Sequence, residues 1–300
     1  MSNAPSKTPP LAWFYLVLMA LVWGSSFILM KRASVVYSIT EVGAGRLFIA
    51  SLFFVPIMLK TKGQVPKDRL PFVFISALIG FVIPAFLFAI AIMHLNSSLS
   101  GMLNSLSPLF TLLVGILFFN MPKNKFQIGG IVVGLVGALL LVFAKNTGSV
   151  LSENTSEYSY AFLILIATVL YGTNTNNIVR NLSQLPALAA SATTFLFIGP
   201  ITFVILLTTD FFSKAINPNY AINTLYLVLL GVFGSGVAAI LYNKVVQMVS
   251  GLFASSVTYL IPIVAIGWGI FDKETIGFQQ YMGMAVILTG IYLVNKKQNA

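Results

Sequence analysis

The chain has 300 residues, of which 58% are hydrophobic and 8% charged, and its net charge is +10. A soluble domain carries about 25% charged residues, so this composition indicates an integral membrane protein and excludes disordered, fibrous and disulfide-stabilised chains. With no cysteine and one histidine, we expect no metal site and no other cofactor. The positive charge fits cationic loops at an anionic membrane surface, so the lipid bilayer is the expected partner and nucleic acid is not.

Ten apolar stretches follow one another along the chain, each near the roughly 20 residues that cross a bilayer as a helix. They lack the alternating pattern of barrel strands, so we predict an all-α protein of ten transmembrane helices. The polar segment before the first stretch gives no indication of a cleaved signal peptide. The predicted limits are 12–33, 39–59, 70–92, 97–119, 125–144, 158–179, 186–208, 221–243, 250–271 and 276–294.

The longest polar linker, 145–157, divides the chain into two predicted five-helix repeats, 12–145 and 157–297. A shift of 154 residues places Gly80 on Gly234 and Pro108 on Pro262, and a shift of 148 places the segment 23–26 on 171–174. Because five is an odd number, the repeats must cross the membrane in opposite senses. Inverted repeats are typical of secondary transporters, in which two related halves exchange conformations.

The distribution of lysine and arginine predicts the orientation. With the N-terminus placed inside, eleven of these residues fall on the inner side and six on the outer side or at the outer ends of helices. Cations are enriched in cytoplasmic loops, so we expect both termini in the cytoplasm.

Two helices carry stripes of small and polar residues at alternating spacings of four and three, which places each stripe on one helix face. In the fourth helix the stripe includes Asn104 and Pro108, and in the ninth it includes Thr258 and Pro262. One interpretation is a cavity wall, and the other is close helix packing through small residues. The two prolines are expected to kink their helices and free backbone carbonyls.

The sixth helix holds five consecutive polar residues, 173–177, some of which must face protein or water. Asn174 and Asn177 are therefore candidate cavity residues, and hydrogen bonding between helices is the alternative. Lys31 and Arg46 are candidates for attracting a substrate carboxylate, although snorkelling or pairing with Glu41 also explains them. His94, at the outer end of the third helix, is a further candidate for a gating or charge role, and a structural role at the outer interface is the simpler explanation.

What the helices lack also bears on mechanism. No acidic residue lies in the middle of a predicted span, where proton- and sodium-coupled carriers often place one. This favours facilitated diffusion or exchange over tight proton coupling. The GxxxxGK[ST] motif for phosphate binding is also absent from the sequence, so the chain is not expected to hydrolyse ATP.

The first helix contains Trp23-Gly24-Ser25-Ser26-Phe27 followed by Lys31, and the second carries Arg46-Leu47-Phe48 about two turns after its start. With these motifs, Pro108, Pro262 and the repeat, nearly the whole chain resembles the drug/metabolite transporter superfamily, specifically its EamA-type carriers. The resemblance implies a carrier in the bacterial inner membrane with a central cavity between the repeats. The lining positions that it implies are Trp23, Asn104, Tyr171, Asn174, Tyr242, Gln247, Thr258 and Tyr259. The first repeat departs from the family pattern, because Asn120 stands where the second has the acidic Glu274.

The sequence therefore predicts a transporter that works by alternating access and exports amino acids or similar small metabolites, and not an enzyme. Two alternatives remain open. A lipid-acting membrane enzyme would need a cluster of carboxylates or histidines at the bilayer surface, and the sequence offers only His94 and Glu41. A scaffold or sensor on a carrier fold would be recognised by a collapsed cavity.

Overall fold

The structure, a computed structural model, describes residues 9–122, 124–142, 156–274 and 276–295. This part of the chain is almost entirely helical and contains no strand. The first repeat contains α1 (Pro10–Ala33), α2 (Ile39–Thr61), α3 (Leu70–Ala77), α4 (Ile83–Ile92), α5 (Ser97–Asn104), α6 (Ser107–Phe118) and α7 (Lys125–Val142). The second contains α8 (Ser156–Asn177), α9 (Ala187–Leu207), α10 (Phe211–Ala215), α11 (Ala221–Leu229), α12 (Ala238–Met248), α13 (Gly251–Ser255), α14 (Ile261–Phe271) and α15 (Phe278–Asn295).

Short segments of tighter or wider helix join several of these elements. Three are 3₁₀-helices, η1 (Lys67–Arg69), η4 (Pro218–Tyr220) and η6 (Ser256–Tyr259), and three are π-helices, η2 (Leu78–Val82), η3 (Ile178–Leu182) and η5 (Leu230–Val237). Counted through these joints, nine segments of the described chain are long and apolar enough to cross a membrane, and Phe278–Val294 forms a shorter apolar tenth. The predicted helical membrane bundle is confirmed.

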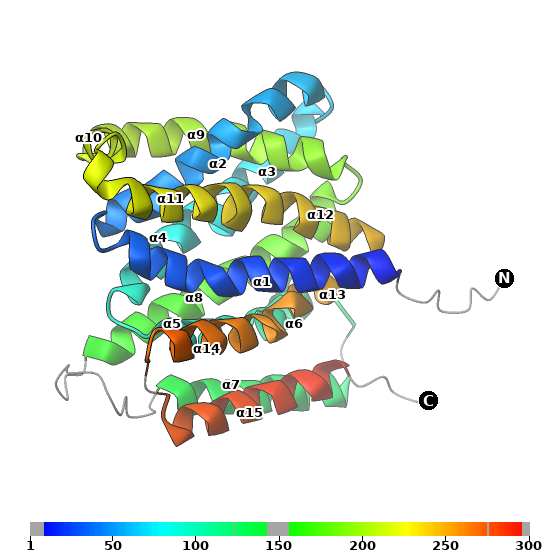
Figure 1. The fold of residues 1–300 in the computed structure, drawn as a ribbon. Helices are drawn as coiled ribbons and strands as arrows, with labels where there is room; N and C mark the ends of the chain where they lie inside the picture. Colours follow the sequence, from blue (N-terminus) through cyan, green and yellow to red (C-terminus); the bar gives the residue numbers. More distant parts are fainter. Residues whose placement is uncertain (1–8, 123, 143–155, 275, 296–300) are drawn as a thin grey trace.

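The helices cross the molecule side by side (Figure 1). Many large apolar side chains are exposed on the outside of the bundle. Leu59, Phe118 and Phe271 are at least 72% exposed. In water such a surface would be unstable, whereas lipid tails satisfy it. The start of α1 and the end of α15 lie at the same end of the bundle (Figure 1); we call this the terminal end and the other the distal end.

The two repeats pack against each other through equivalent contacts. A β-carbon added to Gly24 would lie 2.5 Å from Cβ of Val264, and one added to Gly172 would lie 2.7 Å from the backbone of Phe110. Gly24 and Gly172 are 148 residues apart, and Phe110 and Val264 are 154 apart. The shifts found in the sequence thus relate contacts in space. The repeat limits at 145, 157 and 297 stay predictions, because 143–155 and 296–300 lie outside the described residues.

The π-helices η2 and η5 occupy equivalent places in the two repeats, since Leu78 and Val82 shift by 154 onto positions 232 and 236. The fourth and ninth spans are likewise interrupted at equivalent places. Pro108 lies in the first turn of α6 and Pro262 in the first turn of α14, where a missing backbone N–H costs no intrahelical bond. Each proline therefore begins a new helical segment after an interruption.

The last helices of the repeats, α7 and α15, lie together at one edge of the bundle (Figure 1). Glycines allow their backbones to approach closely: a β-carbon on Gly137 would lie 2.7 Å from the backbone nitrogen of Ile287, and one on Gly290 2.5 Å from that of Gly134. Small residues at helix interfaces serve this kind of packing in membranes.

Candidate functional site

A cavity of about 140 Å³ lies between the two repeats. This volume is well above the roughly 10–15 Å³ needed for a single water. Every long span contributes to the wall except α7 and α15. The lining residues are Trp23, Ser26, Phe27, Met30, Arg46, Leu47, Ser76, Gly80, Phe81, Ala85, Phe88, Asn104, Ser107, Tyr171, Asn174, Thr175, Ile178, Leu182, Ala190, Ser191, Thr194, Gly234, Ser235, Ala239, Tyr242, Asn243, Ser255 and Thr258.

Half of the sequence candidates line this cavity. They are the six proposed substrate-binding residues Trp23, Asn104, Tyr171, Asn174, Tyr242 and Thr258, together with Arg46. The remaining candidates, Lys31, His94, Pro108, Asn177, Gln247, Tyr259 and Pro262, lie elsewhere.

Three of the candidates outside the cavity have clear structural contacts. The Asn177 amide donates to the Phe72 carbonyl at 2.9 Å, and the Gln247 amide donates to the Leu185 carbonyl at 2.7 Å. His94 stacks on Tyr160, with ring centroids 3.7 Å apart. The Asn177 and Gln247 bonds join separate helices or loops, which is the structural alternative for polar residues in a membrane. Tyr259 lies in η6 and packs against the core.

Sequence reasoning missed several polar lining residues, namely Ser76, Ser107, Ser191, Thr194, Ser235 and Asn243. Two other lining residues, Thr175 and Ser255, belong to the predicted polar run and to the ninth-helix stripe. Most of the missed residues are isolated hydroxyl residues in otherwise apolar helices. Asn243 offered the clearest overlooked signal, because an amide within a long apolar span needs a partner. It donates to Ser191 at 3.0 Å, joining α12 to α9.

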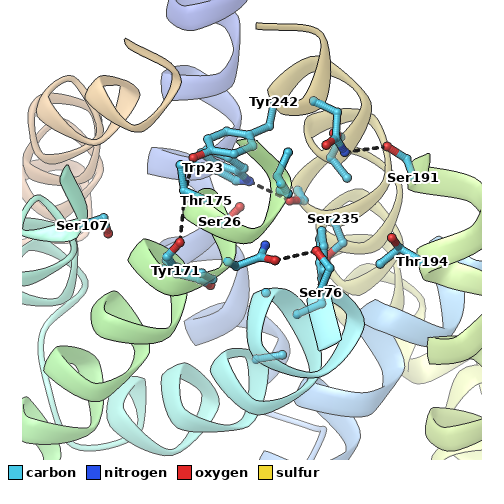
Figure 2. Close-up of a pocket in the computed structure, with 18 of the residues that line it drawn as sticks. Trp23, Ser26, Ser76, Ser107, Tyr171, Thr175, Ser191, Thr194, Ser235 and Tyr242 are labelled. Atoms are coloured by element: carbon cyan, nitrogen blue, oxygen red, sulfur yellow. Dashed lines mark hydrogen bonds between the residues drawn. The ribbon is translucent and has the colours of Figure 1, made fainter. Parts of the chain in front are cut away.

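One corner of the cavity joins α1 to the second repeat. The Trp23 indole donates to the Gly234 carbonyl in η5 at 2.8 Å (Figure 2). Its ring lies against Tyr242, whose hydroxyl pairs with Thr175 at 2.6 Å (Figure 2). Short π-helical segments are frequent at functional sites, and here a backbone carbonyl of η5 accepts a hydrogen bond from a cavity aromatic.

The equivalent corner joins α8 to the first repeat. Ser76 on α3 donates its hydroxyl to the side-chain oxygen of Asn174 (Figure 2). Asn174 also packs directly on Gly80 of η2, so that a β-carbon at position 80 would overlap its amide. A side chain at position 80 would therefore displace the Asn174 amide. The amide nitrogen of Asn174 makes no hydrogen bond to another described residue and remains available to the cavity.

Arg46 is the one charged residue among those lining the cavity. Its Nε donates to the Ser235 hydroxyl in η5 at 3.1 Å, and its Nη1 approaches the Met30 sulfur at 3.5 Å. None of the carboxylates that the structure describes lines the cavity. Among the described residues, no three histidine, aspartate or glutamate side chains lie close enough together to hold a metal ion. The arrangement can hold a small polar molecule by hydrogen bonds and one positive charge.

The distal end of the bundle carries an ion-pair cluster, which we call the distal seal: Lys31, Arg32, Asp272 and Glu274, with Ser97 and Ser98. Lys31 lies 2.6 Å from the Asp272 carboxylate and 2.9 Å from that of Glu274, and Arg32 also pairs with Asp272. Glu274 accepts hydroxyl and backbone bonds from Ser97 and Ser98. The seal thus ties α1 and α5 of the first repeat to the loop between α14 and α15.

Glu274 is stabilised as an anion in this cluster. Burial alone would raise the pKa of its carboxyl group, but hydrogen bonds from Ser97, Lys31 and Ser98 outweigh burial and lower the pKa. A second pair at the same end joins the repeats, with Lys214 2.7 Å from Glu41. Glu41 is 1% exposed and also completes a capping box with Ser38 at the start of α2.

A ten-helix membrane bundle with a polar cavity between inverted repeats defines a carrier-type transporter. The EamA-like transporter family matches this chain over residues 10–143 and 158–296. The protein therefore belongs to the EamA-like transporter family and is a multi-pass membrane transporter.

The chain is similar to several transporters at low sequence identity over most of its length. An uncharacterized transporter of Archaeoglobus fulgidus is 23% identical, covering 95% of this chain and 99% of the relative. An S-adenosylmethionine/S-adenosylhomocysteine transporter of Chlamydia muridarum is 24% identical (88% and 86%), and the inner membrane transporter YedA of Escherichia coli is 25% identical (91% and 87%). A solved crystal structure shares the fold, with a TM-score of 0.65 at 14% identity, over 95% of this chain and 96% of that one.

Proposed function

We propose that this protein is a secondary transporter that works by alternating access and exports amino acids or similar small metabolites. The observation that carries the proposal is the contrast between the two ends of the interface between the repeats. At the distal end, ion pairs hold the repeats together. The cavity wall, by contrast, includes Leu182 and Ala190, close to the terminal-end limits of η3 and α9.

This contrast fits a carrier whose distal pathway is closed. Opening that pathway requires the distal seal to separate, because its partners lie on different repeats. We assign Lys31 to this gating role, since it pairs with two carboxylates at once. From the cation distribution of the loops we assign the terminal end, and with it both termini, to the cytoplasm. The relative YedA, named an inner membrane transporter, supports the bacterial inner membrane as the location.

A cavity with amides, hydroxyls, aromatics and one cation suits a small polar solute. Its lining contains no carboxylate or histidine that could act as a general acid or base, which supports transport and not catalysis.

The test is counterflow in proteoliposomes. Vesicles are loaded with one unlabelled amino acid at a time, and uptake of the same labelled compound is followed with and without a pH gradient. We expect transient accumulation of at least one amino acid, with little response to the gradient because no acid lines the cavity. Accumulation of none, with monodisperse protein, would overturn the proposed substrate class.

A further inference from the structure

We propose that Arg46 anchors an anionic group of the transported molecule, specifically a carboxylate. The inference rests on the proposed function and names the chemistry that the cavity selects.

The guanidinium of Arg46 has unused hydrogen-bonding capacity. Of its five N–H donors, one on Nε is held by Ser235 and one on Nη1 points at the weakly accepting sulfur of Met30. The other three donors, including both on Nη2, have no protein acceptor among the described residues. A carboxylate binds two parallel N–H groups of a guanidinium, and this pairing is among the strongest in proteins. Because Nε is bound by Ser235, the N–H donors on the two Nη groups remain available for a carboxylate.

The charge of Arg46 also lacks a partner. Lys31, Arg32 and Lys214 each pair with a carboxylate, whereas none of the described carboxylates lies within ion-pairing distance of Arg46. An unpaired charge within the membrane is costly, and intramembrane charges typically face cavities that serve function. Because Arg46 lines the cavity, a molecule entering the cavity can supply the missing negative charge.

The repeat symmetry shows that the helix does not need this cation. The second helices begin at Ile39 and Ala187, which are 148 residues apart. The same shift places Arg46 on Thr194, which also lines the cavity and donates its hydroxyl to the Ala190 carbonyl at 2.9 Å. A small residue thus suffices at this position of the fold, and the cation is a specific addition to one side of the cavity.

A second unsatisfied group in the cavity wall favours a solute with a hydrogen-bond donor. The side-chain oxygen of Asn104 is buried and has no hydrogen-bond partner, and the residue is 6% exposed. An oxygen of this kind accepts from an ammonium or hydroxyl group. The ligand class is therefore a small carboxylic acid that also carries an amino or hydroxyl group.

The experiment compares each acid with its uncharged counterpart. Wild-type protein and the variants Arg46→Gln, Arg46→Lys and Arg69→Gln are reconstituted, Arg69 being a half-exposed arginine that does not line the cavity. Counterflow of each L-amino acid is competed by the same compound and by its carboxamide. In parallel, each acid and carboxamide is tested for thermal stabilisation of the detergent-solubilised protein. For the wild type we expect a preference of about 10- to 100-fold for the carboxylate.

Arg46→Gln is expected to remove that preference, Arg46→Lys to keep part of it through charge alone, and Arg69→Gln to keep it whole. Ser235→Ala, which frees the guanidinium without removing it, should weaken carboxylate binding less than Arg46→Gln. This variant keeps the test open if Arg46→Gln does not fold.

The inference is overturned if the wild type binds or transports carboxamides as well as acids, or if Arg46→Gln is folded and keeps the preference. A failure of the proposed function looks different. Counterflow then fails for every compound, while the stabilisation assay still tests whether carboxylates outperform carboxamides in the wild type and not in Arg46→Gln. Equal stabilisation by both members of every pair rejects the anchor there too.

Discussion

The two repeats build equivalent corners of the cavity on one backbone plan and furnish them with different chemistry. In one corner Gly234 lies against Ser26, with a β-carbon at 234 only 2.9 Å from the Ser26 hydroxyl. In the other Gly80 lies against Asn174. Ser26 and Asn174 are 148 residues apart, and the glycines are 154 apart. The symmetric backbone fixes where a solute can bind, while the different side chains give the two corners of the cavity different hydrogen-bonding groups.

The largest expected loss of stability comes from substituting a glycine at a close contact between the repeats. We expect Gly172→Ala to abolish folding or lower stability by about 1–3 kcal/mol or more, because its β-carbon meets the immovable backbone of Phe110 at 2.7 Å. Gly24→Ala should be similarly costly, since the Val264 Cβ, which is fixed to its backbone, lies at 2.5 Å and the Ile261 carbonyl oxygen at 3.0 Å. Monodisperse yield and Tm in detergent measure both losses.

Gly129→Ala is the control, because nothing lies within 4 Å of the added carbon. Its stability should hold or rise slightly, as expected for alanine in a helix. Equal losses for all three variants would mean that the close contacts between repeats carry no special weight.

The next effect concerns the distal seal, which has no repeat-related equivalent because Asn120 replaces the acid in the first repeat. We expect Glu274→Gln to weaken the seal by about 1–3 kcal/mol, since three charged or hydroxyl partners lose a carboxylate. The native chain has no cysteine, so Ser107→Cys provides a single label site in the cavity. Its labelling from the distal side by an impermeant maleimide should rise in the Glu274→Gln background.

Asp68→Asn is the matched control, because Asp68 is 72% exposed and pairs only with Arg69 at 3.2 Å. Surface pairs of this kind contribute little, so labelling should not change. If Glu274→Gln left the labelling unchanged as well, the ion cluster would not be part of a gate.

A smaller effect separates two neighbouring amides. Asn174→Ala should weaken solute affinity several-fold and cost about 1 kcal/mol of stability, because Ser76 loses its acceptor. Asn177→Ala should cost similar stability through its bond to Phe72 yet leave affinity unchanged, since Asn177 does not line the cavity. Measuring the counterflow Km and the Tm of each variant separates the effect on affinity from the effect on stability. An equal loss of affinity in both variants would contradict the placement of Asn174 inside the cavity and Asn177 outside it.

The smallest effect is on pH dependence. The pKa of Glu274 is lowered in the sealed state, so its contribution to the seal is present above the ordinary carboxyl pKa and is lost as the pH falls through the lowered value. The other charged groups of the cluster are Lys31, Arg32 and Asp272. Maleimides react with the thiolate, so the labelling rate itself depends on pH, and the readout is the distal labelling of Ser107→Cys relative to the same label site in the Glu274→Gln background. This ratio should be constant from pH 8 to about pH 5 and rise only in stronger acid. A rise centred near pH 7 would point to a different titrating group.

The spans were predictable from sequence because a helix in lipid needs about 20 consecutive apolar residues, and such runs are easy to recognise. Each predicted stretch matches one apolar helical segment of the structure. The cavity was harder to predict because a lone hydroxyl in an apolar helix usually bonds to its own backbone. Ser51 and Thr202 do so, donating to the carbonyls of Leu47 and Ile198 at 2.9 Å. Ser76 and Ser235 look the same in the sequence, yet packing directs them to Asn174 and Arg46.

The polar run of α8 also shows that sequence alone does not reveal which polar residue faces the cavity. Asn174 and Thr175 face the cavity, whereas Asn176 donates to the Thr111 and Gly172 carbonyls and Asn177 to Phe72. Composition says that such a run must find partners. Which residue meets solute and which meets a neighbouring helix depends on helix rotation, and that is set by contacts from distant parts of the chain such as Gly80.

A lone cation in the cavity also makes the transporter sensitive to voltage. A charge moved across a membrane exchanges about 2.3 kcal/mol per 100 mV. With a simple anion on Arg46 the occupied cavity is electrically neutral, whereas with a zwitterion it keeps the single positive charge of the empty state. Membrane potential should therefore act on the empty and zwitterion-loaded carrier alike and leave the anion-loaded carrier unaffected. Pre-steady-state currents would then report the net charge of the natural solute before its identity is known.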